Sequence, residues 1–155
     1  MRTSKSIEVR IRPIEVTDAD AVAGLSGELG YPVSAAAMEE RIRNYTRLTD
    51  RVVFVAYHDG AVIGWIDVGI VHHLQVEPNG EIGGLVVSNT CRSAGIGAKL
   101  VARAEQWVKE RGLTRMIVRS QIAREAAHRF YLREGYERTK TSAVFSKTLS
   151  AARQS

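Results

Sequence analysis

The 155-residue chain contains 45% hydrophobic and 25% charged residues, the balance of a folded globular protein, and its length suits one domain of ordinary size. Its net charge of +5 is unevenly distributed: residues 1–87 hold 8 Lys/Arg against 12 Asp/Glu, and residues 88–155 hold 14 against 5. The basic half could face a polyanion, and the acidic half could face a cationic ligand.

Several other protein classes are disfavoured. No apolar run approaches the roughly 20 residues that cross a bilayer, and Met1–Ser6 are polar with no apolar stretch after them. The single cysteine, Cys91, excludes an intramolecular disulfide and a cysteine-based zinc cluster. We therefore expect a cytoplasmic protein that forms a single domain over residues 1–155, with flexible ends at 1–6 and 151–155.

The first third of the chain predicts one strand followed by two helices. Ile7–Ile14 alternates apolar and polar residues, which is typical of a strand with one buried face. Thr17 has Asp20 three residues later, close to a capping box, and the helix that follows ends near Gly30. A second helix is predicted over Ser34–Tyr45, with its serine as the N-cap.

Three further strands are predicted before residue 88. Val52–Tyr57 and Ala61–Val71 are rich in β-formers and are joined by Asp59-Gly60, a strong hairpin signal. We interpret Pro78-Asn79-Gly80 as another turn, which leads into a strand over Glu81–Val87. The order up to this point is β-α-α-β-β-β.

The second half adds helices and short strands. A helix that opens at Gly95 and Gly97 and stops near Gly112 carries apolar residues at helical spacing: Leu100, Val101, Ala104, Trp107 and Val108. The elements expected after it are a strand at Met116–Val118, a helix at Glu125–Glu134, and a final hairpin from Tyr136–Arg138 and Ala143–Leu149. The sequence thus predicts a mixed α/β (α+β) domain with one central, mostly antiparallel sheet flanked by helices, in the order β-α-α-β-β-β-α-β-α-β-β.

The segment with the clearest chemistry is Arg92-x-x-Gly95-x-Gly97, which lies between a strand and a helix. A helix N-terminus presents unpaired N–H groups and a positive dipole end, and glycines allow close approach of a phosphate. A P-loop is disfavoured because Lys99 precedes Leu100 at the wrong spacing, and a dinucleotide fingerprint lacks its third glycine. The loop also resembles the pyrophosphate loop of acyl-CoA-dependent N-acyltransferases, although Gly-x-Gly alone does not distinguish it from a structural turn.

Two motifs together resemble the GNAT superfamily of acyltransferases. Residues 127–136, Ala-His-Arg-Phe-Tyr-Leu-Arg-Glu-Gly-Tyr, are similar to the A-x-x-F-Y-x-x-x-G-F/Y segment of that superfamily. The loop from Arg92 to Ala98 resembles its Q/R-x-x-G-x-G/A motif. The resemblance implies the acyl-CoA N-acyltransferase fold and acetyl-CoA as co-substrate. The sequence around residue 128 is similar to that of small-molecule members, including some aminoglycoside acetyltransferases.

The resemblance also implies roles for individual residues. Glu81, eleven residues before Arg92, is similar in place to a catalytic glutamate and would accept the amine proton, while Tyr131 would protonate the departing thiolate. Gly83-Gly84 would form a bulge that lets pantetheine pair with the strand. Arg124 stands where the family commonly has an asparagine. The full expected set for acetyl-CoA is Leu85, Val86, Val87, Arg92, Ser93, Ala94, Gly95, Ile96, Gly97, Ala98, Arg124 and Tyr131.

These features predict an N-acetyltransferase that moves an acetyl group from acetyl-CoA directly to a primary amine of a cationic small molecule, with no metal. The acidic residues expected to rim the acceptor cleft are Glu28, Glu39, Glu40, Asp67 and Glu77. Three alternatives stay open: a protein N-terminal or lysine acetyltransferase, a non-catalytic CoA sensor, and a nucleic-acid-binding module. Nucleic acid is disfavoured because the later aromatic residues occupy core-like positions. No membrane partner is expected, and a homodimer is left open.

Overall fold

The computed structural model describes residues 8–91, 94–120 and 124–150. The ends expected to be flexible, 1–6 and 151–155, lie outside these ranges. The chain divides into two compact units, residues 1–119 and 120–155, which are described separately below. Within the described ranges, no helix is both long and apolar enough to span a membrane.

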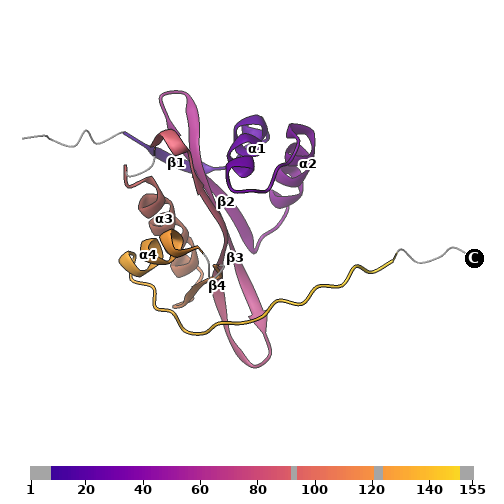
Figure 1. Ribbon diagram of the computed structural model, residues 1–155, viewed down its shortest axis with the longest axis vertical. Coiled ribbons are helices and arrows are strands. Elements are labelled where there is room, and N and C mark those ends of the chain that lie inside the picture. The colour runs from indigo at the N-terminus through magenta and orange to yellow at the C-terminus, as the bar shows by residue number, and fades with distance from the viewer. Residues whose placement is uncertain (1–7, 92–93, 121–123, 151–155) are drawn as a thin grey trace, which may run out of the picture. The chain divides into compact units, whose positions relative to one another are not determined.

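The first unit is built on one five-stranded sheet (Figure 1). Neighbouring strands run antiparallel except for the last pair, which is parallel, so the predicted mixed and mostly antiparallel sheet is confirmed. The strands, in chain order and also in order across the sheet, are β1 (Arg10–Pro13), β2 (Arg51–His58), β3 (Ala61–His73), β4 (Val76–Val87) and β5 (Met116–Val118).

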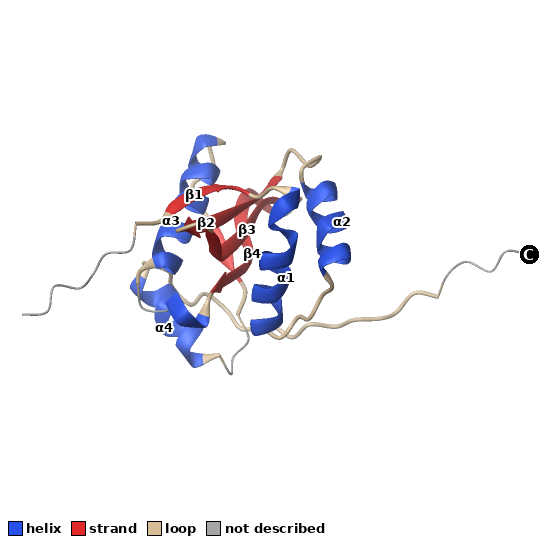
Figure 2. Cartoon of the chain, turned by 90° about the horizontal axis from the view of Figure 1, so that it is seen from above, coloured by secondary structure: helices blue, strands red, loops and turns tan. Residues whose placement is uncertain are grey.

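Helices cover both faces of this sheet. Figures 1 and 2 show α1 (Ala19–Glu28) and α2 (Ala35–Tyr45) on one face and α3 (Ile96–Glu110) on the other. The predicted cap of α2 is confirmed, because the Ser34 hydroxyl accepts a hydrogen bond from the Ala37 amide at 3.1 Å. The five apolar residues predicted for the buried stripe of α3 are all buried.

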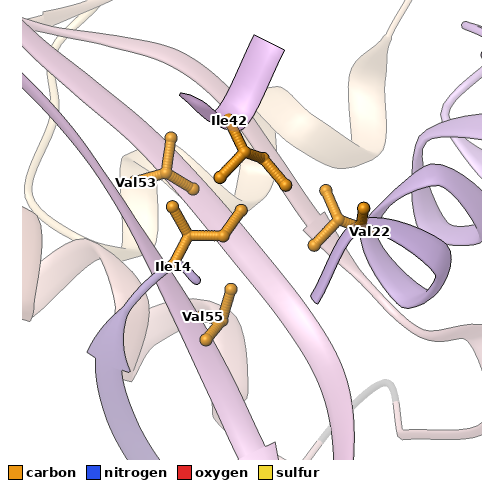
Figure 3. Packing of buried hydrophobic residues seen from close by; sticks show 6 residues of the cluster. Ile14, Val22, Ile42, Val53 and Val55 are labelled. Carbon is orange, nitrogen blue, oxygen red and sulfur yellow. The ribbon is translucent and has the colours of Figure 1, made fainter. Parts of the chain in front are cut away.

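The alternation of β2 supplies side chains to both cores. Val53 and Val55 point toward α1 and α2, where they meet Ile14, Val22 and Ile42 (Figure 3). On the opposite face the Phe54 ring lies under α3, with the Arg103 guanidinium 4.4 Å from its centroid. The sheet is therefore the middle layer between two apolar cores, as expected for strands buried on both faces.

The turn predicted at Pro78-Asn79-Gly80 is wrong. The β3–β4 hairpin turns instead at Leu74 and Gln75, and all three predicted turn residues belong to β4. Gly80 serves helix packing rather than a turn, because a Cβ there would lie 2.5 Å from Val108 of α3. Glycine in a strand often marks a place where another backbone or side chain comes close. At Gly80 this close neighbour is Val108 of α3.

The predicted C-terminal hairpin is also absent from the second unit. After α4 (Glu125–Arg133) and Gly135, residues 136–150 form no strand (Figure 1). The link between the two expected arms, residues 139–142, lacks the Gly or Asn that a tight hairpin turn favours, and Arg138 instead donates to the Thr141 hydroxyl at 2.7 Å. A two-stranded hairpin alone is marginal in water, so apolar alternation did not suffice.

A buried carboxylate ties β1 to the first helical segment. Asp18 is 6% exposed, and its two oxygens accept hydrogen bonds from Arg12 at 2.7 and 2.9 Å and from the Glu15 amide at 2.8 Å. The capping box at the start of this segment is thus formed by Glu15 and Asp18, two residues earlier than the predicted Thr17 with Asp20. Burial acts to raise the pKa of the Asp18 carboxyl, but the bonds from Arg12 and Glu15 outweigh it and hold that pKa below its usual range.

We expect Asp18→Asn to lower the free energy of unfolding by about 2 kcal/mol, because it leaves a partly buried guanidinium without its anion. Asp20→Asn, at an exposed position of α1, is the control and should cost less than about 1 kcal/mol. A carboxyl with a lowered pKa stabilises the fold above its unfolded pKa of about 3.9, and this contribution is lost as the pH falls through the lower folded value. Urea unfolding at neutral pH and near pH 2 measures both effects; equal stability of Asp18→Asn and wild type at neutral pH would contradict them.

Candidate active site

The centre of the candidate site is a β-bulge in β4. Asp67 of β3 pairs with Gly84 and the next residue, Val68, pairs with Ile82, so Gly83 has no partner on β3. A Cβ at Gly83 would lie 2.8 Å from the Asp67 carboxylate, and one at Gly84 would lie 2.9 Å from the Trp65 ring. Because these glycines have no side chains, Asp67 and Trp65 of β3 can pack directly over the bulge. The bulge predicted at Gly83-Gly84 is therefore present.

The bulge coincides with the end of β4–β5 pairing. The parallel ladder joins Gly80–Ile82 to Met116–Val118 and stops one residue before the bulge. Beyond it, Leu85–Val87 pair with Gly64–Ile66 on one side, and no described strand pairs with them on the other. Within the described part of the chain, the outward backbone N–H and C=O groups of this stretch have no ladder partner, and such an edge suits an extended ligand.

The open edge runs toward the N-terminus of α3. Gly95 adopts φ +77°, and the Lys99 amide bonds to its carbonyl at 3.2 Å as the first helical hydrogen bond. The amides of Ile96, Gly97 and Ala98 precede that bond, so they belong to the unpaired first turn that suits an anion. Ala94 is half-buried beside them. Arg92 and Ser93, predicted to complete this loop, lie outside the described residues.

Glu81 lies beside the bulge on the sheet face that α1 and α2 cover. Its neighbour Gly80 faces α3, so the alternation of β4 turns Glu81 to the other face, where its side chain is 23% exposed. The Arg119 Nε atom is 3.7 Å from Glu81 Oε1. This candidate base is therefore partly open to solvent and paired with an exposed cation.

A second charged cluster lies next to it on the same face. Arg51 Nη2 donates to Asp67 Oδ1 at 2.9 Å, and the Tyr45 hydroxyl donates to Asp67 Oδ2 at 3.2 Å. Burial and the Asp67 carboxylate raise the pKa of Tyr45, so its hydroxyl stays a donor. Space for the guanidinium comes from Gly69, where a Cβ would lie 2.5 Å from Arg51 Nη1. The sequence interpretation included Asp67 but missed Arg51 and Tyr45. Arg51 comes next to Asp67 through the β2–β3 register, in which Arg51 pairs with Gly69.

The five acidic residues predicted to rim the cleft do not gather as a group. Glu28, Glu40 and Glu77 are exposed on α1, α2 and β4 respectively. Glu39 pairs with Arg43 one turn later on α2, and Asp67 pairs with Arg51. Two of the five negative charges are therefore compensated locally, which weakens the attraction for a cation that their number suggested.

In the second unit, Tyr131 lies within an aromatic cluster of α4 and the residues after it. Its ring makes edge contacts with Phe130 and Tyr136, at centroid distances of 5.1 and 5.7 Å. Burial raises the pKa of the Tyr131 hydroxyl, and the cation of Arg124, the residue before α4, opposes this. The hydroxyl therefore remains protonated at neutral pH, as a proton donor must.

The sequence is similar to those of known acetyltransferases. The family model described as "Acetyltransferase (GNAT) family" matches residues 20–136. An aminoalkylphosphonate N-acetyltransferase of Salmonella typhimurium is 38% identical over 86 residues, which cover 55% of this chain and only 56% of that enzyme. An aminoglycoside N(6′)-acetyltransferase of Stenotrophomonas maltophilia is 24% identical over 140 residues, 87% of this chain and 92% of that enzyme.

A solved structure has the same fold. It is the aminoglycoside acetyltransferase AAC(6′)-Iy in complex with a bisubstrate analogue of CoA and acetylneamine, with a TM-score of 0.81 at 20% identity, covering 92% of this chain and 99% of that one. Because the family model spans most of the chain, and the bulged strand and glycine-capped helix are the features that its motifs led us to expect, the chain belongs to the GNAT family of acetyltransferases.

Proposed function

We propose that this protein is an acetyl-CoA-dependent N-acetyltransferase that acts on a primary amine of a small molecule. The observation that carries the proposal is the open edge of β4 after the Gly83 bulge, which leads into the unpaired first turn of α3. One end of this path suits an amide-containing chain, and the other suits a diphosphate. Pantetheine joined to a pyrophosphate has both parts in that order.

Acetyl-CoA would bind along this path through backbone groups. The pantetheine amides would pair with Leu85–Val87, and the pyrophosphate would accept hydrogen bonds from the amides of residues 94–98, with Arg92 and Ser93 completing the loop. Arg124 would serve the pantetheine where relatives commonly have an asparagine. The basic surplus of the second half fits a ligand of such high negative charge.

The reaction would be a direct transfer in a ternary complex. The amine nitrogen attacks the thioester carbonyl, the C–N bond forms, and the C–S bond breaks to release the CoA thiolate. A lysine-like amine with a pKa of about 10.4 is mostly protonated at pH 7, and its neutral form lies about 4.6 kcal/mol uphill. Glu81 would accept the proton that the amine loses, directly or through a water, and the Tyr131 hydroxyl would donate the proton that the thiolate gains.

The relatives support a small amino compound as the acceptor. Their names describe N-acetylation of aminoalkylphosphonates and of aminoglycosides, both of which carry primary amines. The amine itself would be a cation in solution, and the Glu81 carboxylate lies beside the bulge to receive it. Acetylation of a protein N-terminus or lysine is the alternative acceptor class.

The direct test is release of free CoA thiol from acetyl-CoA with a panel of small amines, lysine-containing peptides and no acceptor. We expect turnover with small amines well above the rate without acceptor. CoA binding with no turnover on any amine would indicate a CoA sensor, and tight, salt-dependent DNA binding without turnover would indicate a nucleic-acid module.

We expect Gly95→Ala to weaken CoA binding at least tenfold, because a Cβ at φ +77° disfavours the backbone that aims the first-turn amides. Gly112→Ala is the matched control: it has the same φ, lies in equally open space, and caps the other end of α3. Both variants should lose about 1 kcal/mol of stability. Calorimetry that finds the same CoA affinity in both variants would remove the loop from the binding site.

Glu81→Gln should lower kcat about 10²–10⁴-fold, because the amide keeps the shape of the side chain but cannot accept the amine proton. Glu110→Gln, at the exposed C-terminal end of α3, is the control and should keep wild-type kcat. Steady-state rates with saturating acetyl-CoA measure the difference. A Glu81→Gln enzyme within twofold of wild type would assign the base to another group.

Tyr131→Phe should lower kcat much more than it changes either KM, since proton donation matters only as the thiolate leaves. The ring contacts with Phe130 and Tyr136 survive in this variant, so a packing role alone predicts no loss. Because the pKa of Tyr131 is raised, its ionisation should not limit the rate below about pH 10. An unchanged kcat would mean that solvent protonates the thiolate.

A further inference from the structure

Two ion pairs lie side by side on the sheet face that carries the candidate base. Glu81 pairs with Arg119, and Asp67 pairs with Arg51. We call these four residues the dipolar face. Its net charge is zero, although the first half of the chain is acidic overall. A ligand at this face therefore meets both signs of charge at short range.

The sheet register fixes how the two pairs are arranged. Glu81 pairs across the ladder with Gly69, and Gly69 lies two residues from Asp67 on the same face of β3. The Arg51 side chain lies over Gly69 and against Gly83, where it pairs with Asp67. On the β5 side, Ile117 pairs with Glu81, and Arg119 follows two residues later. The two ion pairs therefore occupy neighbouring register positions on β2, β3, β4 and just after β5.

The two arginines differ in their freedom to meet a ligand. Arg51 is 26% exposed and is held by Asp67, by the glycines beneath it and by the Tyr45 ring. Arg119 is 57% exposed, and its Nε atom lies 3.7 Å from Glu81 Oε1, an ion pair that is longer than a hydrogen bond. An exposed pair of this kind is worth about 0–1 kcal/mol, so a ligand that offers both charges can replace it at little cost.

We propose that the acceptor is a dipolar amine, one that carries an anionic group such as a phosphonate or carboxylate within a short chain of its amino group. Its ammonium group approaches Glu81 and its anionic group binds the Arg119 guanidinium, so each partner of the open ion pair gains a charged partner from the ligand. The Arg51–Asp67 pair keeps the neighbouring surface neutral. A polycation gains from Glu81 but is repelled by Arg119, so it is the poorer acceptor. This inference rests on the proposed function and narrows its substrate class.

The test compares acceptors of similar size at saturating acetyl-CoA: 2-aminoethylphosphonate and β-alanine as dipolar amines, ethanolamine as the match whose second group is neutral, and 1,3-diaminopropane as the dication. We expect kcat/KM for one of the dipolar amines to exceed that for ethanolamine and for the diamine at least tenfold. Using both a phosphonate and a carboxylate distinguishes which anion the site prefers. Higher kcat/KM for the diamine or for ethanolamine overturns the proposal.

Variants of Arg119 then assign the effect to this residue. Arg119→Gln should raise KM for the preferred dipolar amine about 10- to 100-fold, the usual cost of a lost charged hydrogen bond, while KM for acetyl-CoA stays unchanged. Arg119→Glu should reverse the preference toward the diamine, which a merely structural role would not do. Arg115→Gln, another exposed arginine just before β5, is the control and should behave as wild type.

The possible failures are distinguishable. If no amine in the broad panel is acetylated, the proposed function itself fails. If amines are acetylated but Arg119→Gln leaves the KM of the dipolar amine unchanged, the enzyme stands and the dipolar-acceptor inference is wrong.

Discussion

The single extra residue at Gly83 determines the shape of the site. One unpaired residue shifts the register of β4 against β3, and the parallel ladder to β5 ends immediately before it. Beyond the bulge, none of the described strands pairs with Leu85–Val87 on the side away from β3. Bulges are costly for a sheet, since they leave backbone groups unpaired, and this one lies where unpaired groups can serve binding. In the first unit, the bulge in β4 and the end of the described β4–β5 ladder thus lie at the same place.

Two different physical features meet at the bulge. On the edge of the sheet, the stretch of β4 that no described strand covers leads to the first-turn amides of α3, and together they suit a long anionic co-substrate. On the face of the sheet, Glu81 and the Arg51–Asp67 pair lie around the same glycines and suit a charged acceptor. In the proposed function, the edge and the face would bring co-substrate and acceptor to the same few residues. Direct transfer needs this proximity, because it replaces a bimolecular encounter by an oriented one.

The sequence predicted the elements whose signals are local. The Ser34 cap, the Asp59-Gly60 turn and the apolar stripe of α3 depend on neighbouring residues, and all three are confirmed. Signals whose meaning depends on distant partners were misread. Gly80 was interpreted as a turn residue, but its lack of a side chain serves contact with Val108, a relation between a strand and a helix that no local window contains. The C-terminal hairpin failed for a similar reason, since alternation gives a strand only where a partner strand exists.

The same limit applied to charge. Counting acidic residues in the first half predicted an attraction for cations, but Glu39 and Asp67 are each paired with an arginine, and the count carried no information about pairing. The cluster of Arg51, Asp67 and Tyr45 joins residues 51, 67 and 45 from three separate elements, so its members became a unit only through the sheet register. The candidate base Glu81 could be found from sequence through its resemblance to a family, whereas its partner Arg119 required the structure.

Amide hydrogen exchange with and without saturating CoA tests most directly whether the interrupted strand and the helix terminus form one binding path. The account predicts that CoA slows exchange at the amides of Leu85–Val87 and of Ile96–Ala98, while the amides of β1 exchange as before. Tight CoA binding that leaves both of these segments unprotected, with protection appearing elsewhere in the chain, would contradict it.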